Sequence, residues 1–201
     1  MNPPLQLNIE VADKATPAIR ALLAQMQDMS EIYEAASGEV YELVRGHLEN
    51  AAGSRHTTAQ RLGAQPTGHL TRAAESVGHS HDANSATIEV TSPGIRRAYG
   101  PLDIRPVNKR YLTIPADAAS YGKWVSDMRR DGWNVFRPRG RMFLAGTQGK
   151  GKEAKNTFRV LFWLAEQVTI PHDPGLMPSD DDMSGAVTRA IKNQIKRKIP
   201  T

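Results

Sequence analysis

The sequence has 201 residues, 39% of them hydrophobic and 23% charged, which fits one globular domain or one domain with appendages. It contains no cysteine, which excludes a disulfide framework and a thiolate zinc site. No stretch approaches the roughly 18 apolar residues of a membrane span, and the N-terminus MNPPLQLNIEV lacks the basic start and apolar core of a signal peptide. We therefore expect a soluble protein made in a cytoplasm.

The charge is distributed unevenly along the chain. Residues 1–95 carry a net charge of −5 and residues 96–201 a net charge of +10. Such asymmetry indicates a surface that meets an acidic partner, either nucleic acid or a neighbouring protein. Solvated faces and helix ends are the alternative explanation.

The first elements are a strand and two helices. Residues 5–11 alternate apolar and polar side chains, which predicts a half-buried strand. A helix follows, capped by Thr16 with Pro17 in its first turn. A second helix is predicted from about Glu31 to Glu49, and its apolar stripe consists of Ile32, Ala36, Val40, Leu43, Val44, His47 and Leu48.

The middle of the chain predicts less regular structure. Residues 51–69 have few large apolar side chains and predict a long loop. A short helix then carries Leu70, Ala73, Ala74 and Val77, and a polar turn at 79–85 precedes a strand at 86–90. Three prolines in residues 94–115 favour irregular extended chain.

Residues 117–171 alternate between helix, hairpin and loop signals. We predict a helix over 117–130 and then a hairpin over 134–146 with Pro138 and Gly140 at its tip. Residues 146–156 predict a basic, glycine-bearing loop, and residues 157–171 a long apolar strand. Thr-Ile-Pro occurs at 113–115 and at 169–171, and we expect the two copies to end two strands of one sheet.

The C-terminal element is a helix predicted over 179–199. Ser179 and the three aspartates that follow are typical of a helix start, and apolar residues then recur every four positions. Acidic residues at its N-terminus and basic residues at its C-terminus both favour the helix dipole. The basic end, with Lys192, Lys196 and Arg197, is also a candidate partner contact.

Three catalytic or ligand motifs can be considered, and we expect none to function. Gly146 to Lys152 matches the spacing of a phosphate loop, but Glu153 stands where Ser or Thr should bind Mg²⁺. His79, His81 and Asp82 could bind a metal, but an exposed polar turn is the simpler reading. His47 fits a hydrogen-bonded core histidine, and no Gly-x-Ser-x-Gly elbow is present. We predict no cofactor, no metal and no enzymatic activity.

Basic side chains around the predicted hairpin are the remaining candidates. Arg137, Arg139 and Arg141 alternate and would share one face of a continuous strand. Lys150, Lys152 and Lys155 follow in the next loop. Such side chains can contact phosphates without reading sequence, can dock on an acidic patch of another subunit, or can be solvated.

The order of several phrases resembles a known family. The phrases are NIEVADKATPAIRALL, HTTAQRLGAQPTGHL, GIRRAYGPLDIRPVNKRYLTIP and QVTIPHDPGLMPSDDDM. They resemble the phage virion morphogenesis family of Mu-like phages, which includes tail-completion proteins. The resemblance is strongest at 94–115 and 168–183. Related members often carry Ile-Pro-Ala-Arg-Pro-Phe-Leu before the last helix, whereas this chain reads Ile170-Pro-His-Asp-Pro-Gly-Leu176, without the Arg-Phe pair.

The resemblance implies structural work in a virion. Family members are similar to head–tail joining or tail-completion components, which are small α+β proteins that assemble as rings, often hexameric. Connector, tail terminator or tail tube proteins would be the neighbours, and packaged DNA a further partner. A DNA-binding accessory protein of phage assembly is the alternative.

Together these expectations define one α+β domain over residues 1–201. It should have a mostly antiparallel sheet, long helices packed on it, projecting hairpin loops and a C-terminal helix.

Overall fold

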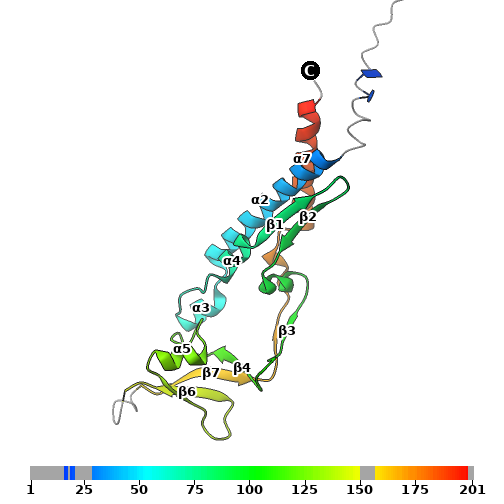
Figure 1. The fold of residues 1–201 in the computed structure, drawn as a ribbon. Coiled ribbons are helices and arrows are strands. Elements are labelled where there is room, and N and C mark those ends of the chain that lie inside the picture. Colours follow the sequence, from blue (N-terminus) through cyan, green and yellow to red (C-terminus); the bar gives the residue numbers. More distant parts are fainter. Residues whose placement is uncertain (1–15, 18, 21–28, 150–156, 199–201) are drawn as a thin grey trace, which may run out of the picture. The chain divides into compact units, whose positions relative to one another are not determined.

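The computed structural model describes residues 16–17, 19–20, 29–149 and 157–198. Two compact units divide the chain: one comprises residues up to Glu42 with Gly78–Ile88 and the segment from Asp180, and the other comprises Leu43–Val77 and Glu89–Ser179 (Figure 1). The secondary structure consists of helices and antiparallel sheets, so the protein is of the α+β class, as predicted. No helix among these residues is long and apolar enough to cross a bilayer.

The first unit contains the N-terminal part of helix α2 (Ser30–Ser54), a hairpin of β1 (Val77–His81) and β2 (Ala86–Val90), and helix α7 (Asp180–Lys198). Its buried residues are small, which lets helices approach closely; they are Ala36, Ser37, Val40, Ala186 and Ala190. His79 on β1 contacts α2, because its Nδ1 lies 3.2 Å from Ser37 Oγ and its ring packs 4.9 Å from the ring of Tyr41.

The two helices predicted with the strongest periodicity are confirmed. Helix α2 covers the predicted range and continues to Ser54, and α7 matches the predicted C-terminal helix. Of the N-terminal helix, Thr16, Pro17, Ile19 and Arg20 are helical. The predicted strand at 5–11 lies outside the described residues.

In the second unit, short helices follow α2. These are α3 (Thr57–Leu62), α4 (His69–Glu75) and the 3₁₀ turn η1 (Pro93–Ala98). Gly63 ends α3 with φ of 63°, the left-handed conformation that glycine adopts at helix C-termini. Buried Leu48 of α2, Leu70 of α4 and Ile95 of η1 belong to the core of this unit.

Two sheets complete this unit. A ribbon pairs β3 (Leu102–Ile104) with β8 (Val168–Ile170), and the 3₁₀ turn η2 (Pro174–Leu176) follows β8. A four-stranded antiparallel sheet has the order β4-β7-β6-β5, and its strands are β4 (Leu112–Pro115), β5 (Asn134–Phe136), β6 (Phe143–Thr147) and β7 (Arg159–Ala165). Helix α5 (Val125–Arg130) packs on one face of this sheet (Figure 1).

A bulge in β7 builds the core between α5 and the sheet. Ala145 pairs with Val160 but Leu144 pairs with Phe162, so Leu161 is an extra residue in its strand. A bulge lets two neighbours point toward the same side. Leu161 and Phe162 are therefore both buried, at 0% and 1% exposure, together with Met128 of α5 and Val135 of β5.

The predicted loop at 51–69 is wrong. Helix α2 extends to Ser54, α3 occupies 57–62, and α4 begins at His69. Alanine has the highest helix propensity, and small residues suit close packing: Ala51 and Ala59 are 6% and 1% exposed. The small side chains in residues 51–69 therefore indicate closely packed helices and not a long loop.

The predicted helix at 117–130 is only half present. Gly122 has φ of 72°, which ends the initial turns, and α5 starts at Val125. A Cβ on Gly122 would lie 2.8 Å from the side-chain atom Thr67 Cγ2, so another residue would be strained both by this contact and by the positive φ. As a result Trp124 lies at the N-cap of α5 and is 74% exposed.

The two Thr-Ile-Pro phrases do end strands, but in different sheets. The first closes β4 of the four-stranded sheet, and the second closes β8 of the ribbon. The hairpin at 134–146 is confirmed, since β5 and β6 pair antiparallel and Arg141 N donates to Pro138 O at its tip. Residues 146–147 belong to β6, so the predicted loop starts later, and 150–156 lie outside the described residues.

Candidate functional site

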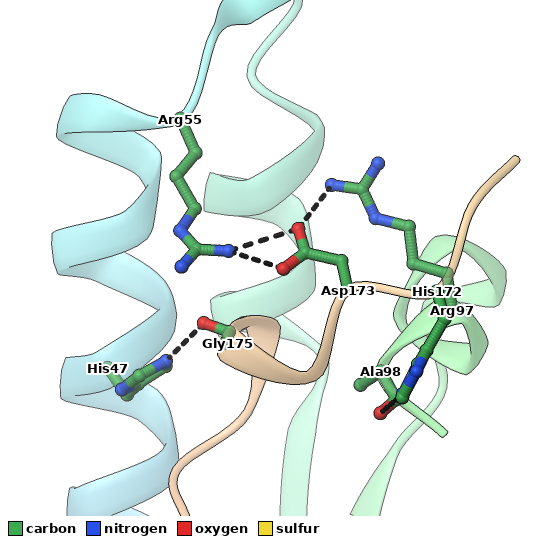
Figure 2. A network of polar contacts seen from close by, with 7 residues as sticks. All are labelled: His47, Arg55, Arg97, Ala98, His172, Asp173 and Gly175. Atoms are coloured by element: carbon green, nitrogen blue, oxygen red, sulfur yellow. Dashed lines mark hydrogen bonds and ion pairs between the residues drawn. The ribbon is translucent and has the colours of Figure 1, made fainter. Parts of the chain in front are cut away.

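Asp173 is the centre of a polar network that joins three elements of the second unit (Figure 2). Its carboxylate accepts hydrogen bonds from Arg55 Nη1 at 2.8 and 3.0 Å, and Arg97 Nη2 lies 3.7 Å away. Its backbone N–H donates to Arg97 O at 2.8 Å. The segment after β8 is thereby fixed to the end of α2 and to η1.

Two histidines flank this contact (Figure 2). His47 Nε2 donates to Gly175 O at 3.1 Å, and His172 Nε2 donates to Ala98 O at 2.9 Å. His47 is thus the hydrogen-bonded histidine that the sequence predicts. A Cβ on Gly175 would lie 2.5 Å from Arg55 Nη2, so a side chain there would displace the Arg55 guanidinium from its present position.

The surroundings of Asp173 are otherwise cationic. Partial burial, followed by the charges of Arg97, His56 and Arg72, lowers the pKa of His69 below its ordinary value.

The phrases GIRRAYG and IPHDPG, which carry the family resemblance, meet at this network. Its role is to hold the chain path, because His47, His172 and Asp173 each bond to a group elsewhere in the protein.

We expect Asp173→Ala to lower the free energy of unfolding by about 1 kcal/mol, the range of a partly exposed, hydrogen-bonded ion pair. Two arginines would then face each other without a counter-ion. The melting temperature should fall by about 2–4 °C, measured by circular dichroism.

Glu49→Ala is the matched control, since it removes the exposed pair with Arg45 within one helix. That change should cost about 0.3–0.5 kcal/mol. Equal shifts for the two variants would contradict a special role for Asp173.

The predicted basic residues that the structure describes belong to different elements of the fold. Arg137, Arg139 and Arg141 are exposed in the β5–β6 turn, and Lys192, Lys196 and Arg197 are exposed on α7 of the other unit. Lys150, Lys152 and Lys155 lie outside the described residues.

The three arginines do not share one strand face, because the hairpin tip predicted at Pro138 and Gly140 interrupts their alternation. Gly140 has φ of 71° and the chain reverses between Pro138 and Arg141, so these residues form a turn and not a strand. Arg137 folds back: its Nε donates to Arg141 O at 2.8 Å, and its guanidinium carbon lies 5.0 Å from the centre of the Tyr111 ring.

A cavity of about 750 Å³ opens where Arg137 folds back. Four cationic side chains line it, namely Lys109, Arg110, Arg129 and Arg137, and no aspartate or glutamate among the described residues does so. The aromatic rings of Tyr111 and Trp124 belong to the same wall, and Leu144 and Leu164 of the sheet contribute apolar surface. We call this cavity the cationic pocket.

The charges of the cationic pocket are not neutralised within the described residues. None of its four cations forms an ion pair with a carboxylate there. Asp127 of α5, two residues before Arg129, accepts hydrogen bonds from Arg130 Nη2 at 2.6 Å and from the Trp124 N–H at 2.9 Å. The pocket is therefore a site of positive potential beside exposed aromatic surface.

Sequence reasoning missed most of this pocket. Lys109 and Arg110 are adjacent in the phrase PVNKRY, which predicts only irregular extended chain, and Arg129 falls at the end of the helix predicted over 117–130. The available signal was the combination of two adjacent cations with Tyr111 just before a strand. Trp124 could not be found, because its exposure depends on the break at Gly122.

The face of the four-stranded sheet that points away from α5 carries partly exposed aromatic side chains. Phe143 pairs with Trp163 across β6 and β7 with ring centres 6.0 Å apart, and Phe136 packs 6.3 Å from Phe158. Phe136 is 38% exposed, and Phe158 and Trp163 are each 51% exposed. We call these four residues the aromatic face.

The enzymatic motifs gain no support from the geometry. Gly146 lies within β6, and the next described strand, β7, is antiparallel to β6, while residues 150–156, which contain the lysines and Glu153 of the phosphate-loop match, lie outside the described residues. Asp82 accepts the N–H groups of Asn84 and Ser85 and so organises a turn. Among the described residues, no three histidine, aspartate or glutamate side chains are grouped to hold a metal.

Comparison with protein-family models, with curated proteins and with solved structures finds no match to this chain. The family resemblance therefore rests on the phrases in the sequence, and functional inference rests on the two surfaces described above.

Proposed function

We propose that this chain is a non-enzymatic structural component of a phage virion, at the head–tail junction or the upper end of the tail, and that it acts as a homo-oligomeric ring. The observation that carries the assembly part of this proposal is the aromatic face. The virion part rests on the order of phrases that resembles the virion morphogenesis family.

The aromatic face suits contact between subunits for an energetic reason. Large aromatic side chains lose favourable burial when they remain in water, about 25 cal/mol for each Å². Contiguous exposed apolar surface typically marks an interaction site, and tryptophan is enriched among the residues that dominate binding energy. Packing this face against another copy would bury Phe158 and Trp163, each half exposed in the single chain.

In the proposed mechanism, the shape of each subunit determines how it contacts the next copy. The bulged sheet and α5 give each subunit a fixed edge, the aromatic face contacts the next copy, and connector, terminator or tube proteins would meet the remaining surfaces. A DNA-binding accessory protein is the second candidate, and the cationic pocket is the observation that favours it.

Trp163→Glu should weaken self-association at least about 30-fold, because it places a charge in an interface and removes an aromatic anchor. Sedimentation velocity across a concentration series measures this directly. Tyr99→Glu is the control: Tyr99 is 75% exposed, lies at the end of η1, and should tolerate the same charge without loss of assembly. A wild-type chain that stays monomeric at every concentration would overturn the ring.

The virion location is tested on particles. Mass spectrometry of purified particles from cells that express the gene in its natural context should detect the chain, and particles made without it should lack joined tails. Complete, infective particles free of this chain would contradict the proposal.

A further inference from the structure

We propose that the cationic pocket binds single-stranded nucleic acid, with phosphates on its arginine and lysine side chains and a base stacked on Trp124. This inference concerns a site of its own and does not depend on whether the chain forms a ring.

The charge of the pocket favours an anionic ligand. Lys109, Arg110, Arg129 and Arg137 converge on one cavity without a carboxylate in its lining. Arg110 and Arg137 place their guanidinium carbons 5.2 and 5.0 Å from the same ring, that of Tyr111. Two like charges on one ring repel each other, and the cation–π attraction to Tyr111 offsets only part of that. A phosphate would neutralise both, with the fork geometry that guanidinium groups favour.

The aromatic surface narrows the class of anion. Trp124 is 74% exposed at the start of α5, so its ring is open to a flat partner. Stacking of bases on aromatic side chains beside a basic groove is the common mode by which proteins hold single strands. Leu144, Leu164 and Val107 add apolar surface for a sugar or base edge. A free phosphate or an acidic peptide would leave this part of the pocket unused.

The size of the cavity also favours a single strand. About 750 Å³ falls within the range of small-ligand sites, which corresponds to a nucleotide unit and not to the width of a double helix. In a duplex the bases are stacked inside, and Trp124 could reach only sugar and phosphate.

Fluorescence anisotropy with a labelled 20-nucleotide oligo-dT tests the proposal, in a titration repeated from 50 to 200 mM NaCl. Four phosphate contacts predict a slope of log affinity against log salt of about −3 for a single strand. The double variant Arg110→Ala/Arg129→Ala should reduce the slope to about half. Trp124→Ala should weaken binding about tenfold at constant salt slope, because it removes a stacked base and no charge.

The controls separate the pocket from general attraction to a basic protein. Lys192→Ala/Lys196→Ala removes the same charge from exposed positions on α7 and should leave the slope near that of the wild type. Trp163→Ala removes an exposed tryptophan of the aromatic face and should leave oligo-dT affinity unchanged. Thermal melting of each variant confirms folding.

Several results would overturn the inference. Equal losses in the two double variants would assign binding to net charge alone. A poly-glutamate peptide that binds more tightly than oligo-dT would make the pocket a protein-docking site. Duplex DNA that binds as tightly as oligo-dT, with no effect of Trp124→Ala, would exclude stacking. Sedimentation of the pocket variants should show unchanged self-association, so a failure here is distinct from a failure of the proposed ring.

Discussion

Phe162→Ala is expected to destabilise the protein by about 3–5 kcal/mol, the cost of deleting a buried phenylalanine side chain. Phe162 is 1% exposed and belongs to the cluster with Met128, Val135 and Leu161, all of them nearly inaccessible. The cavity cannot collapse easily, because the bulge already fixes the strand on which Phe162 lies. The melting temperature should fall by roughly 10 °C or more.

The neighbouring residue supplies the control. Trp163→Ala removes a larger ring from the same strand, but this ring is half exposed on the other face of the sheet. At a dilution where the chain is monomeric, that change should cost about 1 kcal/mol or less. Similar losses for the two variants, measured by near-ultraviolet circular dichroism during heating, would show that α5 and the sheet do not form the core described here.

Gly146→Val is the second large effect, and here two opposing contributions must be compared. Glycine weakens a strand interior, so a β-branched residue would ordinarily add up to about 1 kcal/mol of stability. At this position, however, a Cβ would lie 2.4 Å from Leu161 Cδ1 and 3.0 Å from Trp133 Cε3. Overpacking of this kind costs about 1–3 kcal/mol, and a valine has two further methyl groups to place. We therefore expect a net loss of stability.

A double variant makes this prediction specific. Leu161→Ala removes the atom nearest to the new side chain, so Gly146→Val should cost less in that background, with a coupling of about 1 kcal/mol or more. Gly78→Val in β1 is the control, because a Cβ there meets nothing within 4 Å. Chemical denaturation midpoints measure all four proteins. Additive effects of Gly146→Val and Leu161→Ala would contradict the contact.

Local patterns predicted those elements whose sequence agrees with their environment. Helix α7 combines acidic residues at its start with regular apolar spacing, and the β5–β6 hairpin has Pro138 and Gly140 at its tip. Where the environment decides, the patterns failed. Helix α3 packs through alanine, and the helix predicted at 117–130 is broken because Gly122 approaches Thr67.

The candidate surfaces were harder to predict than the elements. Arg137 was singled out, but its partners come from the segment before β4 and from α5, and only the tertiary fold brings these together. The aromatic face was missed because phenylalanine and tryptophan in strands ordinarily indicate a core. Phe136, Phe143 and Trp163 appear together only when the register of β5, β6 and β7 is known.

The nesting of the two sheets has a consequence for how the chain acquires its structure. Strands β3 and β8 pair Leu102 with Ile170. The whole four-stranded sheet lies between these strands in the sequence, and its first and last strands also pair, with Leu112 opposite Ala165. Bringing distant partners together costs more entropy as the intervening chain lengthens. Once residues 105–167 are folded, their two ends lie close together and the segment acts as a short link. The β3–β8 ribbon can then pair last, at a small further loss of chain entropy. An excursion of this kind can also be exchanged during evolution while the path of the surrounding chain stays the same.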